Sequence, residues 1–171
     1  MAAQIRYRLT GGASNTSPAA SLGGAMSTAA GGIITDNAAN NVWDDITGAE
    51  SAAGDVEYRC LAVQNFGDQT LVGAKIWIDD QGSGVAGSNL AIGLDAAAIG
   101  ATPTSTSTAA DESTAPSPAV TFSTPTTEGA AISIGDIPAG QAKIFWERRT
   151  VTAGASAGTD VPSVTVKGDS L

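Results

Sequence analysis

Residues 54–80, GDVEYRCLAVQNFGDQTLVGAKIWIDD, form the best-defined structural unit of the sequence. In its first half alternate residues share a face, and we expect the inward face to carry Val56, Tyr58, Cys60 and Ala62. In its second half the apolar face is formed by Val72, Ala74, Ile76 and Ile78. Asn65, Gly67 and Asp68 lie between the halves and supply the chemistry of a chain reversal. The pattern predicts two antiparallel strands paired as a hairpin.

A second stretch, GDIPAGQAKIFWERR at 135–149, fits a ligand site, a nucleic-acid strip or a sheet strand, and we favour the strand. Pro138 to Gly140 make a turn, after which side chains alternate between the two faces. We expect Ala142, Ile144 and Trp146 to point inward. We expect Lys143, Phe145, Glu147 and Arg149 to point outward, with Phe145 half-exposed.

The remaining chain shows short apolar runs and long stretches of small residues, without a sustained helical period. Further strands are expected at 4–9, 32–35, 88–95, 119–123, 130–134 and 161–169, and a short strand or one helical turn within 40–54. Residues 10–32 are expected to form an extended arm, and the Ser/Thr/Pro-rich residues 101–118 a mobile or draped loop. We divide the chain into an N-terminal strand and arm, 1–35, and a β-sandwich domain, 36–171, with a long loop at 96–118.

Composition limits the classes of partner. The net charge of −9 repels nucleic-acid phosphates and anionic membranes, so we expect neither as a partner. No apolar run approaches the roughly 20 residues of a membrane span. The N-terminal MAAQIRYRLT lacks the apolar segment of a secretion signal, which predicts synthesis and retention in the cytoplasm or release inside a larger particle.

Catalytic and metal-binding chemistry is poorly represented. The sequence has no histidine, which removes the commonest general base and zinc ligand. Its single cysteine, Cys60, is expected to be an inert buried thiol. Paired acids at 44–45, 79–80 and 111–112 lack the spacing of a calcium loop, so turn capping is favoured over calcium binding. We therefore expect no cofactor, no metal site and no enzymatic activity.

Two resemblances add to this interpretation. The segment YRCLAVQNFGDQTLVGAKIWIDD, followed by GDIPAGQAKIFWERRTV, resembles the immunoglobulin-like β-sandwich of bacterial and archaeal surface modules. The order of the pieces across residues 36–169, from DNAANNVWDDITGAESAAGDVEYRC to VTVKGD, is similar to that of small structural proteins of tailed bacteriophages. This second resemblance implies a virion protein without active-site residues.

The sequence thus predicts an all-β sandwich, immunoglobulin-like or jelly-roll-like, with long Gly/Ala/Ser/Thr-rich loops and an N-terminal arm. The expected function is a capsid decoration or cement subunit of a phage virion, made in the host cytoplasm. It is expected to be a homo-oligomer that contacts the major capsid protein or other virion proteins. The alternatives are a neck, tail or baseplate component, or a carbohydrate- or receptor-binding module.

The expected subunit interface uses the outward strand faces and the arms, which would drape over neighbouring subunits. Its residues are Arg6, Arg8, Arg59, Lys75, Trp77, Lys143, Phe145 and Arg149. Reversing the charges of Arg59, Lys75, Lys143 and Arg149 together is expected to weaken assembly and leave the fold intact.

Overall fold

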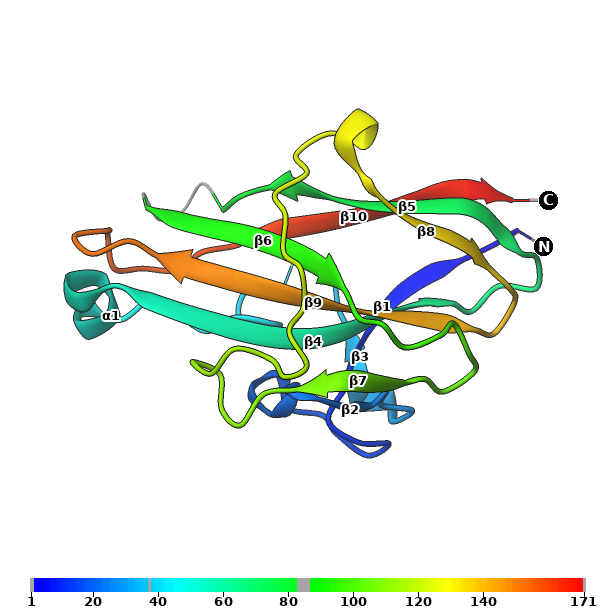
Figure 1. The fold of residues 1–171 in the computed structure, drawn as a ribbon, viewed down its shortest axis with the longest axis horizontal. Coiled ribbons are helices and arrows are strands. Elements are labelled where there is room, and N and C mark those ends of the chain that lie inside the picture. Colours follow the sequence, from blue (N-terminus) through cyan, green and yellow to red (C-terminus); the bar gives the residue numbers. More distant parts are fainter. Residues whose placement is uncertain (1, 37, 83–86, 171) are drawn as a thin grey trace.

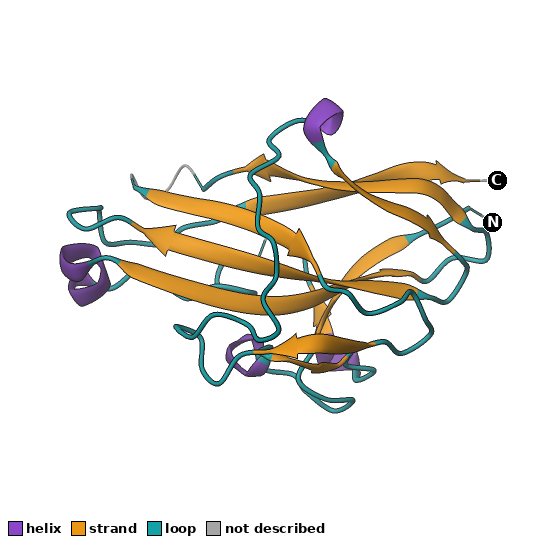
Figure 2. Cartoon of the chain, viewed as in Figure 1, coloured by secondary structure: helices purple, strands orange, loops and turns teal. Residues whose placement is uncertain are grey.

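The computed structural model describes residues 2–36, 38–82 and 87–170, and these are mostly antiparallel β-strands (Figure 2). The strands are β1 Ile5–Leu9, β2 Gly23–Ala25, β3 Ile33–Ile34, β4 Asp55–Asn65, β5 Leu71–Asp80, β6 Ser88–Leu94, β7 Thr104–Thr108, β8 Ile132–Ile137, β9 Ala142–Val151 and β10 Ser163–Ser170. The helices are α1 Gly48–Ala53 and the short 3-10 helices η1 Pro18–Ala20, η2 Ala30–Gly32 and η3 Glu128–Ala130.

The strands form three sheets that stack as layers (Figure 1). A five-stranded sheet, in the order β3-β1-β4-β9-β6, lies in the middle. A three-stranded sheet, β10-β5-β8, packs on one of its faces, and the two-stranded sheet β2-β7 lies on the other side. The predicted all-β sandwich is therefore confirmed, while its immunoglobulin-like or jelly-roll type stays a prediction.

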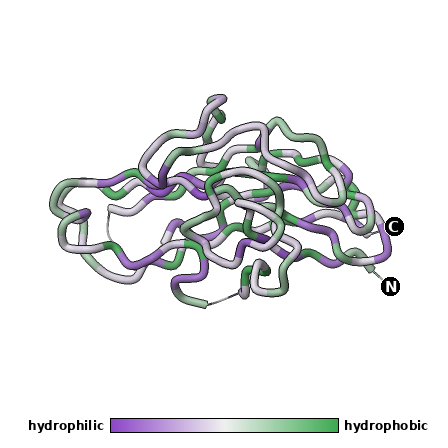
Figure 3. Tube along the Cα trace, turned by 90° about the horizontal axis from the view of Figure 1, so that it is seen from below, coloured by the Kyte–Doolittle hydropathy of each residue, from purple (hydrophilic) through white to green (hydrophobic). Residues whose placement is uncertain are grey.

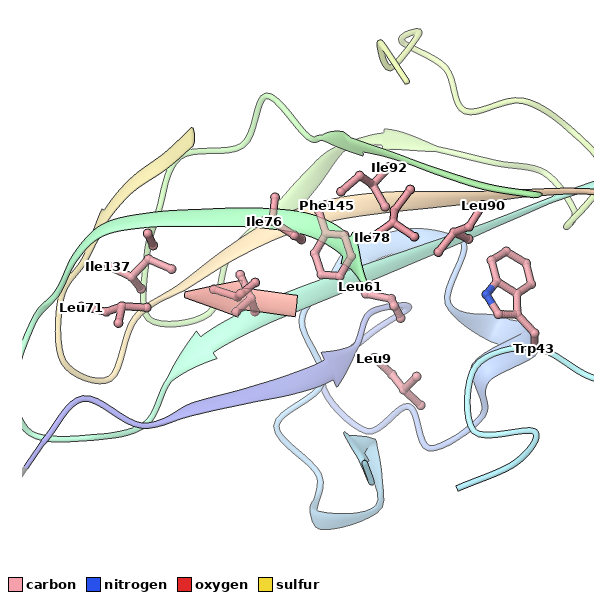
Figure 4. Packing of buried hydrophobic residues seen from close by; sticks show 13 residues of the cluster. Leu9, Trp43, Leu61, Leu71, Ile76, Ile78, Leu90, Ile92, Ile137 and Phe145 are labelled. Atoms are coloured by element: carbon pink, nitrogen blue, oxygen red, sulfur yellow. The ribbon is translucent and has the colours of Figure 1, made fainter. Parts of the chain in front are cut away.

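The main hydrophobic core fills the space between the two larger sheets. Figure 4 shows Leu61, Phe145 and Ile78 pointing toward one another there, with Trp43 at one end of the cluster. The five-stranded sheet contributes Leu61, Val63, Leu90, Ile92 and Phe145, and the three-stranded sheet contributes Leu71, Ala74, Ile76, Ile78, Ile137 and Val166. Burial of side chains of this size stabilises the fold by about 1.5–3 kcal/mol each.

The opposite face of the five-stranded sheet is buried as well. Cys60, Ala62, Ile144 and Trp146 pack there in a second cluster with Met26 and Ala97. Adjacent residues of β9 therefore lie in different cores: Phe145 is 1% exposed and Trp146 is fully buried. The expectation of a half-exposed Phe145 is wrong, because it assumed that only one face of this sheet would be covered.

The chain itself supplies that second cover. The predicted arm and the predicted loop pair with each other, Gly23 with Thr108 and Ala25 with Thr104. The segment that follows β7 then crosses the outer face of the five-stranded sheet toward β6 (Figure 1). It passes so close to β6 that a Cβ on Gly93 would collide with the carbonyl oxygen of Thr121. Both small-residue segments are thus structural layers of their own subunit.

The predicted hairpin at 54–80 is wrong in its pairing, although both strands exist. β4 belongs to the five-stranded sheet and β5 to the three-stranded sheet, so their connection crosses from one layer to the other. Asn65 is fully buried and holds this crossing, since its side-chain amide donates to the carbonyls of Gln69 at 2.7 Å and Ile137 at 2.9 Å. Its Oδ1 accepts from the backbone N–H of Gly67 at 3.1 Å.

Most of the other predicted elements are present. The strands expected at 4–9, 32–35, 88–95, 130–134 and 161–169 correspond to β1, β3, β6, β8 and β10. At 119–123 the structure has a single bridge, Ser123 with Ile92, in place of the expected strand. Within 40–54 the helical alternative is correct: α1 is closed by a reciprocal cap between Thr47 and Glu50. Figure 3 shows hydrophobic and hydrophilic residues interspersed along the whole trace.

Candidate functional site

The interior of the sandwich carries charge at the end near Trp43. β4 contains Glu57 and Arg59, two residues apart, and β9 contains Glu147 and Arg149 at the same spacing. The antiparallel register places Glu57 opposite Arg149 and Arg59 opposite Glu147. All four side chains share the face that continues into the main core, and each is at most 5% exposed.

The two arginines are fully engaged with acids and carbonyl groups. Arg149 Nε donates to Glu57 Oε2 at 2.6 Å, and its Nη1 donates to the carbonyl oxygen of Asp44 at 2.8 Å. Arg59 Nη2 donates to Glu112 Oε2 at 2.6 Å. Because a buried charge without a partner is costly, these pairs are required for the fold to tolerate the arginines.

Trp43 covers this cluster. Its ring centroid lies 5.1 Å from the guanidinium carbon of Arg59 and 5.0 Å from that of Arg149, within the range of cation–π attraction. Its Nε1–H donates to Glu147 Oε2 at 3.1 Å. The indole is 4% exposed, so its faces are used inside the protein and offer no platform for a sugar ring.

Glu147 differs from the other three charged residues because no described residue forms an ion pair with it. Burial raises the pKa of the Glu147 carboxyl from 4.5 to about 7, although the Trp43 hydrogen bond and the charge of Arg59 oppose the shift. Burial also raises the pKa of Glu57, against the influence of Arg149. Glu147 is therefore close to its titration midpoint at neutral pH.

A cavity of about 130 Å³ opens beside this cluster. Apolar wall is supplied by Val42, Leu61 and Val164, and polar wall by Glu147 and Asp160. Val161, also on the lining, is 49% exposed and marks the mouth of the cavity.

Asp160 is the unusual side chain of this cavity. It is 3% exposed, and neither of its carboxylate oxygens has a hydrogen-bond partner among residues 2–36, 38–82 and 87–170. It packs against Gly82, where a Cβ would collide with Asp160 Oδ1. A buried carboxylate in this state loses its hydration without compensation, so it marks a position where a donor is missing.

Tyr7 and two asparagines complete the polar lining. Tyr7 Oη donates to the carbonyl oxygen of Val164 at 3.0 Å, and burial raises the pKa of this phenol. Asn40 and Asn41 line the cavity from the segment before Trp43. The arrangement can therefore accept hydrogen bonds from a positively charged group between apolar walls.

Five of the eight predicted interface residues are buried, so they are not available on an exposed surface as expected. Arg59, Arg149 and Phe145 lie inside the sandwich, as described above. Arg8 is 8% exposed and donates to Gln64 Oε1 at 2.7 Å and to the carbonyl oxygen of Ser27 at 2.9 Å, so it anchors the chain's own N-terminal segment. Trp77 does lie on the outer face of β5, but it is only 8% exposed.

The other three predicted residues remain at least partly accessible. Lys75 is exposed on the outer face of the three-stranded sheet. Arg6 is half-buried, with its guanidinium carbon 3.4 Å from the ring centroid of Phe66. Lys143 is half-buried and donates to the carbonyl oxygens of Asp95 at 2.7 Å and Ala97 at 2.5 Å.

These positions also overturn the expectation that the fourfold charge reversal would leave the fold intact. A carboxylate at position 59 or 149 would lie buried beside the acids that those arginines now neutralise. Such a variant is expected to unfold, so it does not test assembly.

The residues that sequence reasoning missed are Trp43, Glu57, Glu147 and Asp160. A signal for two of them was present, because Glu-x-Arg occurs in both β4 and β9, and antiparallel pairing sets each Glu opposite an Arg. No comparable pattern marks Asp160, which reaches the cavity from the loop before β10.

Three further features bear on function: membrane-spanning helices, metal-binding clusters and similarity to known proteins. No helix within the described residues is long and apolar enough to cross a membrane. Within the same ranges, no three His, Cys, Asp or Glu side chains gather in a way that would hold a metal ion. No family model matches the chain, and neither a curated protein nor a solved structure matches it.

Proposed function

We propose that this chain is a non-enzymatic structural protein of a tailed-phage virion, a decoration or cement subunit on the capsid. The ordered resemblance across residues 36–169 suggests the class of protein. The partner is the major capsid protein or another virion protein, and copies of the chain associate with one another on the particle.

The observation that carries the docking role is the exposed outer face of the three-stranded sheet. The five-stranded sheet has both faces covered by its own chain, whereas this face presents exposed Lys75, Lys167, Gly73 and Ser133. Lys75 and Lys167 are direct cross-strand partners. Like charges in this position repel, and among the described residues Glu128 forms an ion pair with Lys167, at 2.9 Å, and not with Lys75. An acidic patch on a partner would relieve the repulsion.

Folding back of the small-residue segments also favours a cement role. Since β2, β7 and the following segment are ordered on their own subunit, little conformational entropy is lost when the subunit binds. Cementing then consists of burying the outer sheet face across a seam between capsid subunits, which adds contacts that resist the pressure of packaged DNA.

The test is quantitative mass spectrometry of purified particles of the phage whose genome encodes the chain. A cement subunit is expected at a copy number comparable with that of the major capsid protein. A copy number comparable with that of a neck, tail or baseplate ring would favour that location instead. Absence from particles together with binding to a glycan array would favour the carbohydrate- or receptor-binding alternative and end the proposal.

A single exposed charge tests the docking face. Lys75→Glu is expected to fold normally and to bind particles at least about tenfold more weakly, because it would face an acidic patch. Asp45→Lys, an exposed charge reversal near α1, is the control and should bind as the wild type does. Equal binding by Lys75→Glu and the wild type would contradict this choice of face.

A further inference from the structure

We infer that the cavity lined by Glu147 and Asp160 receives a lysine or arginine side chain from a partner protein. The lining of this cavity includes the exposed Val161 and does not include Lys75. The inference does not depend on the virion assignment, because it follows from the chemistry of the cavity.

The first argument is the unpaired carboxylate. Asp160 is only 3% exposed, and no donor in the described part of the chain reaches either of its oxygens. A buried acceptor of this kind costs stability until a donor reaches it, and a charged donor repays more than a neutral one. The cavity wall is where such a donor can enter, since Asp160 lines it.

The second argument is the local charge balance. Arg149 is neutralised by Glu57 and Asp44, and Arg59 by Glu112. Glu147 accepts only the neutral indole N–H of Trp43 among the bonds it forms with described side chains. Within the described ranges neither carboxylate of the cavity forms an ion pair, although the charge of Arg59 acts on Glu147 from a distance, and a cation from outside would complement both.

The third argument is the shape and polarity of the wall. Val42, Leu61 and Val164 are apolar and suit the methylene stem of a lysine or arginine, while the acids suit its charged end. Val161 is one of two large hydrophobic residues that are exposed in the described part of the chain. An apolar rim of this kind packs against the surface of a protein partner. A free inorganic cation has no apolar surface and would leave the rim exposed.

The binding test uses blocked amino acids as probes. Nα-acetyl-lysine methylamide and Nα-acetyl-arginine methylamide are titrated into ¹⁵N-labelled protein, with the assigned indole N–H of Trp43 as the reporter. At least one of them is expected to shift this resonance with saturation, whereas the norleucine and citrulline analogues are not. Equal shifts from charged and neutral probes would overturn the inference. Binding of methylammonium as tight as that of the blocked amino acids would show that the cavity selects a small cation and not a protein side chain, and would overturn the inference too.

The variant test separates binding from structure. Asp160→Asn is expected to weaken probe binding at least about tenfold and to leave the protein as stable as the wild type or more so, because it removes an unpaired buried charge. Glu147→Gln is expected to weaken binding as well. Asp169→Asn, an exposed change at the far end of β10, is the matched control and should bind like the wild type.

Loss of folding in Asp160→Asn would also overturn the inference, because it would mean that this carboxylate stabilises the isolated protein. Unchanged binding in Asp160→Asn would do the same. Retained stability with lost binding supports it, since a residue with a purely structural role would not give that combination.

Discussion

Replacement of Glu147 by glutamine is predicted to stabilise the protein, and to do so only at higher pH. The wild-type carboxyl is buried between β4, β9 and the segment of Trp43, with Tyr7 lining the same cavity and Arg59 opposite in the register. Glutamine keeps the shape and an oxygen that accepts the indole N–H of Trp43. It removes the charge that burial disfavours.

The magnitude follows from linkage between proton binding and folding. The pKa of Glu147 is about 7 in the folded protein, against 4.5 for an unperturbed carboxyl. Between these values the folded state binds more protons than the unfolded state, so stability falls as pH rises. The contribution of the protonated Glu147 carboxyl to the free energy of unfolding is complete below about pH 4.5 and is lost above about pH 7. The free energy of unfolding at these two limits differs by about 3 kcal/mol.

The assay is urea unfolding of the wild type and of Glu147→Gln at a series of pH values between 4.5 and 8. The difference in the free energy of unfolding should increase with pH in favour of the variant and level off above pH 7. Glu128→Gln, which alters an exposed ion pair, is the control and should change stability by less than about 1 kcal/mol at every pH. A difference for Glu147→Gln that does not vary with pH would contradict a raised pKa of Glu147 in the folded protein.

Three further predictions concern the buried faces. Arg149→Met should lower the free energy of unfolding in urea by about 3–5 kcal/mol, because it leaves Glu57 buried and unpaired. Adding Glu57→Leu should restore most of this loss, and a loss that persists in the double variant would contradict the prediction. Phe145→Ala should cost about 3–5 kcal/mol, whereas a half-exposed residue would cost far less in the same assay. Cys60 is fully buried, with the pKa of its thiol raised to about 12, so Ellman's reagent should label it only after denaturation; rapid labelling of the native protein would show that its cover opens.

Local patterns predicted most of the strands, because period-2 alternation depends only on neighbouring residues. Runs such as QIRYRL and AKIFWERR became β1 and β9 with small differences at their ends. The same patterns did not identify the inward face. In β4 and β9 both faces are apolar over part of their length, so alternation separates two faces without showing which of them meets the other sheet.

The candidate site was largely hidden from sequence reasoning. Sequence reasoning places the acids and arginines of β4 and β9 on outward faces, since charge usually indicates exposure to solvent. Their burial depends on a register that sets each charge beside its opposite, and on Trp43 reaching them from another segment. No local pattern points to Asp160, because its environment is created by chain segments that are distant in sequence.

Strand formation can be predicted from the amino-acid sequence, since alternation and turn chemistry act over a few residues. The division of those strands between sheets, and the third layer made by the segments at 10–32 and 101–118, become visible in the folded chain alone. Each strand joins the sheet in which its apolar side chains are covered, and that outcome depends on the whole chain. A buried Phe145 next to a buried Trp146 requires covers on both sides of β9, and those covers come from residues tens of positions away.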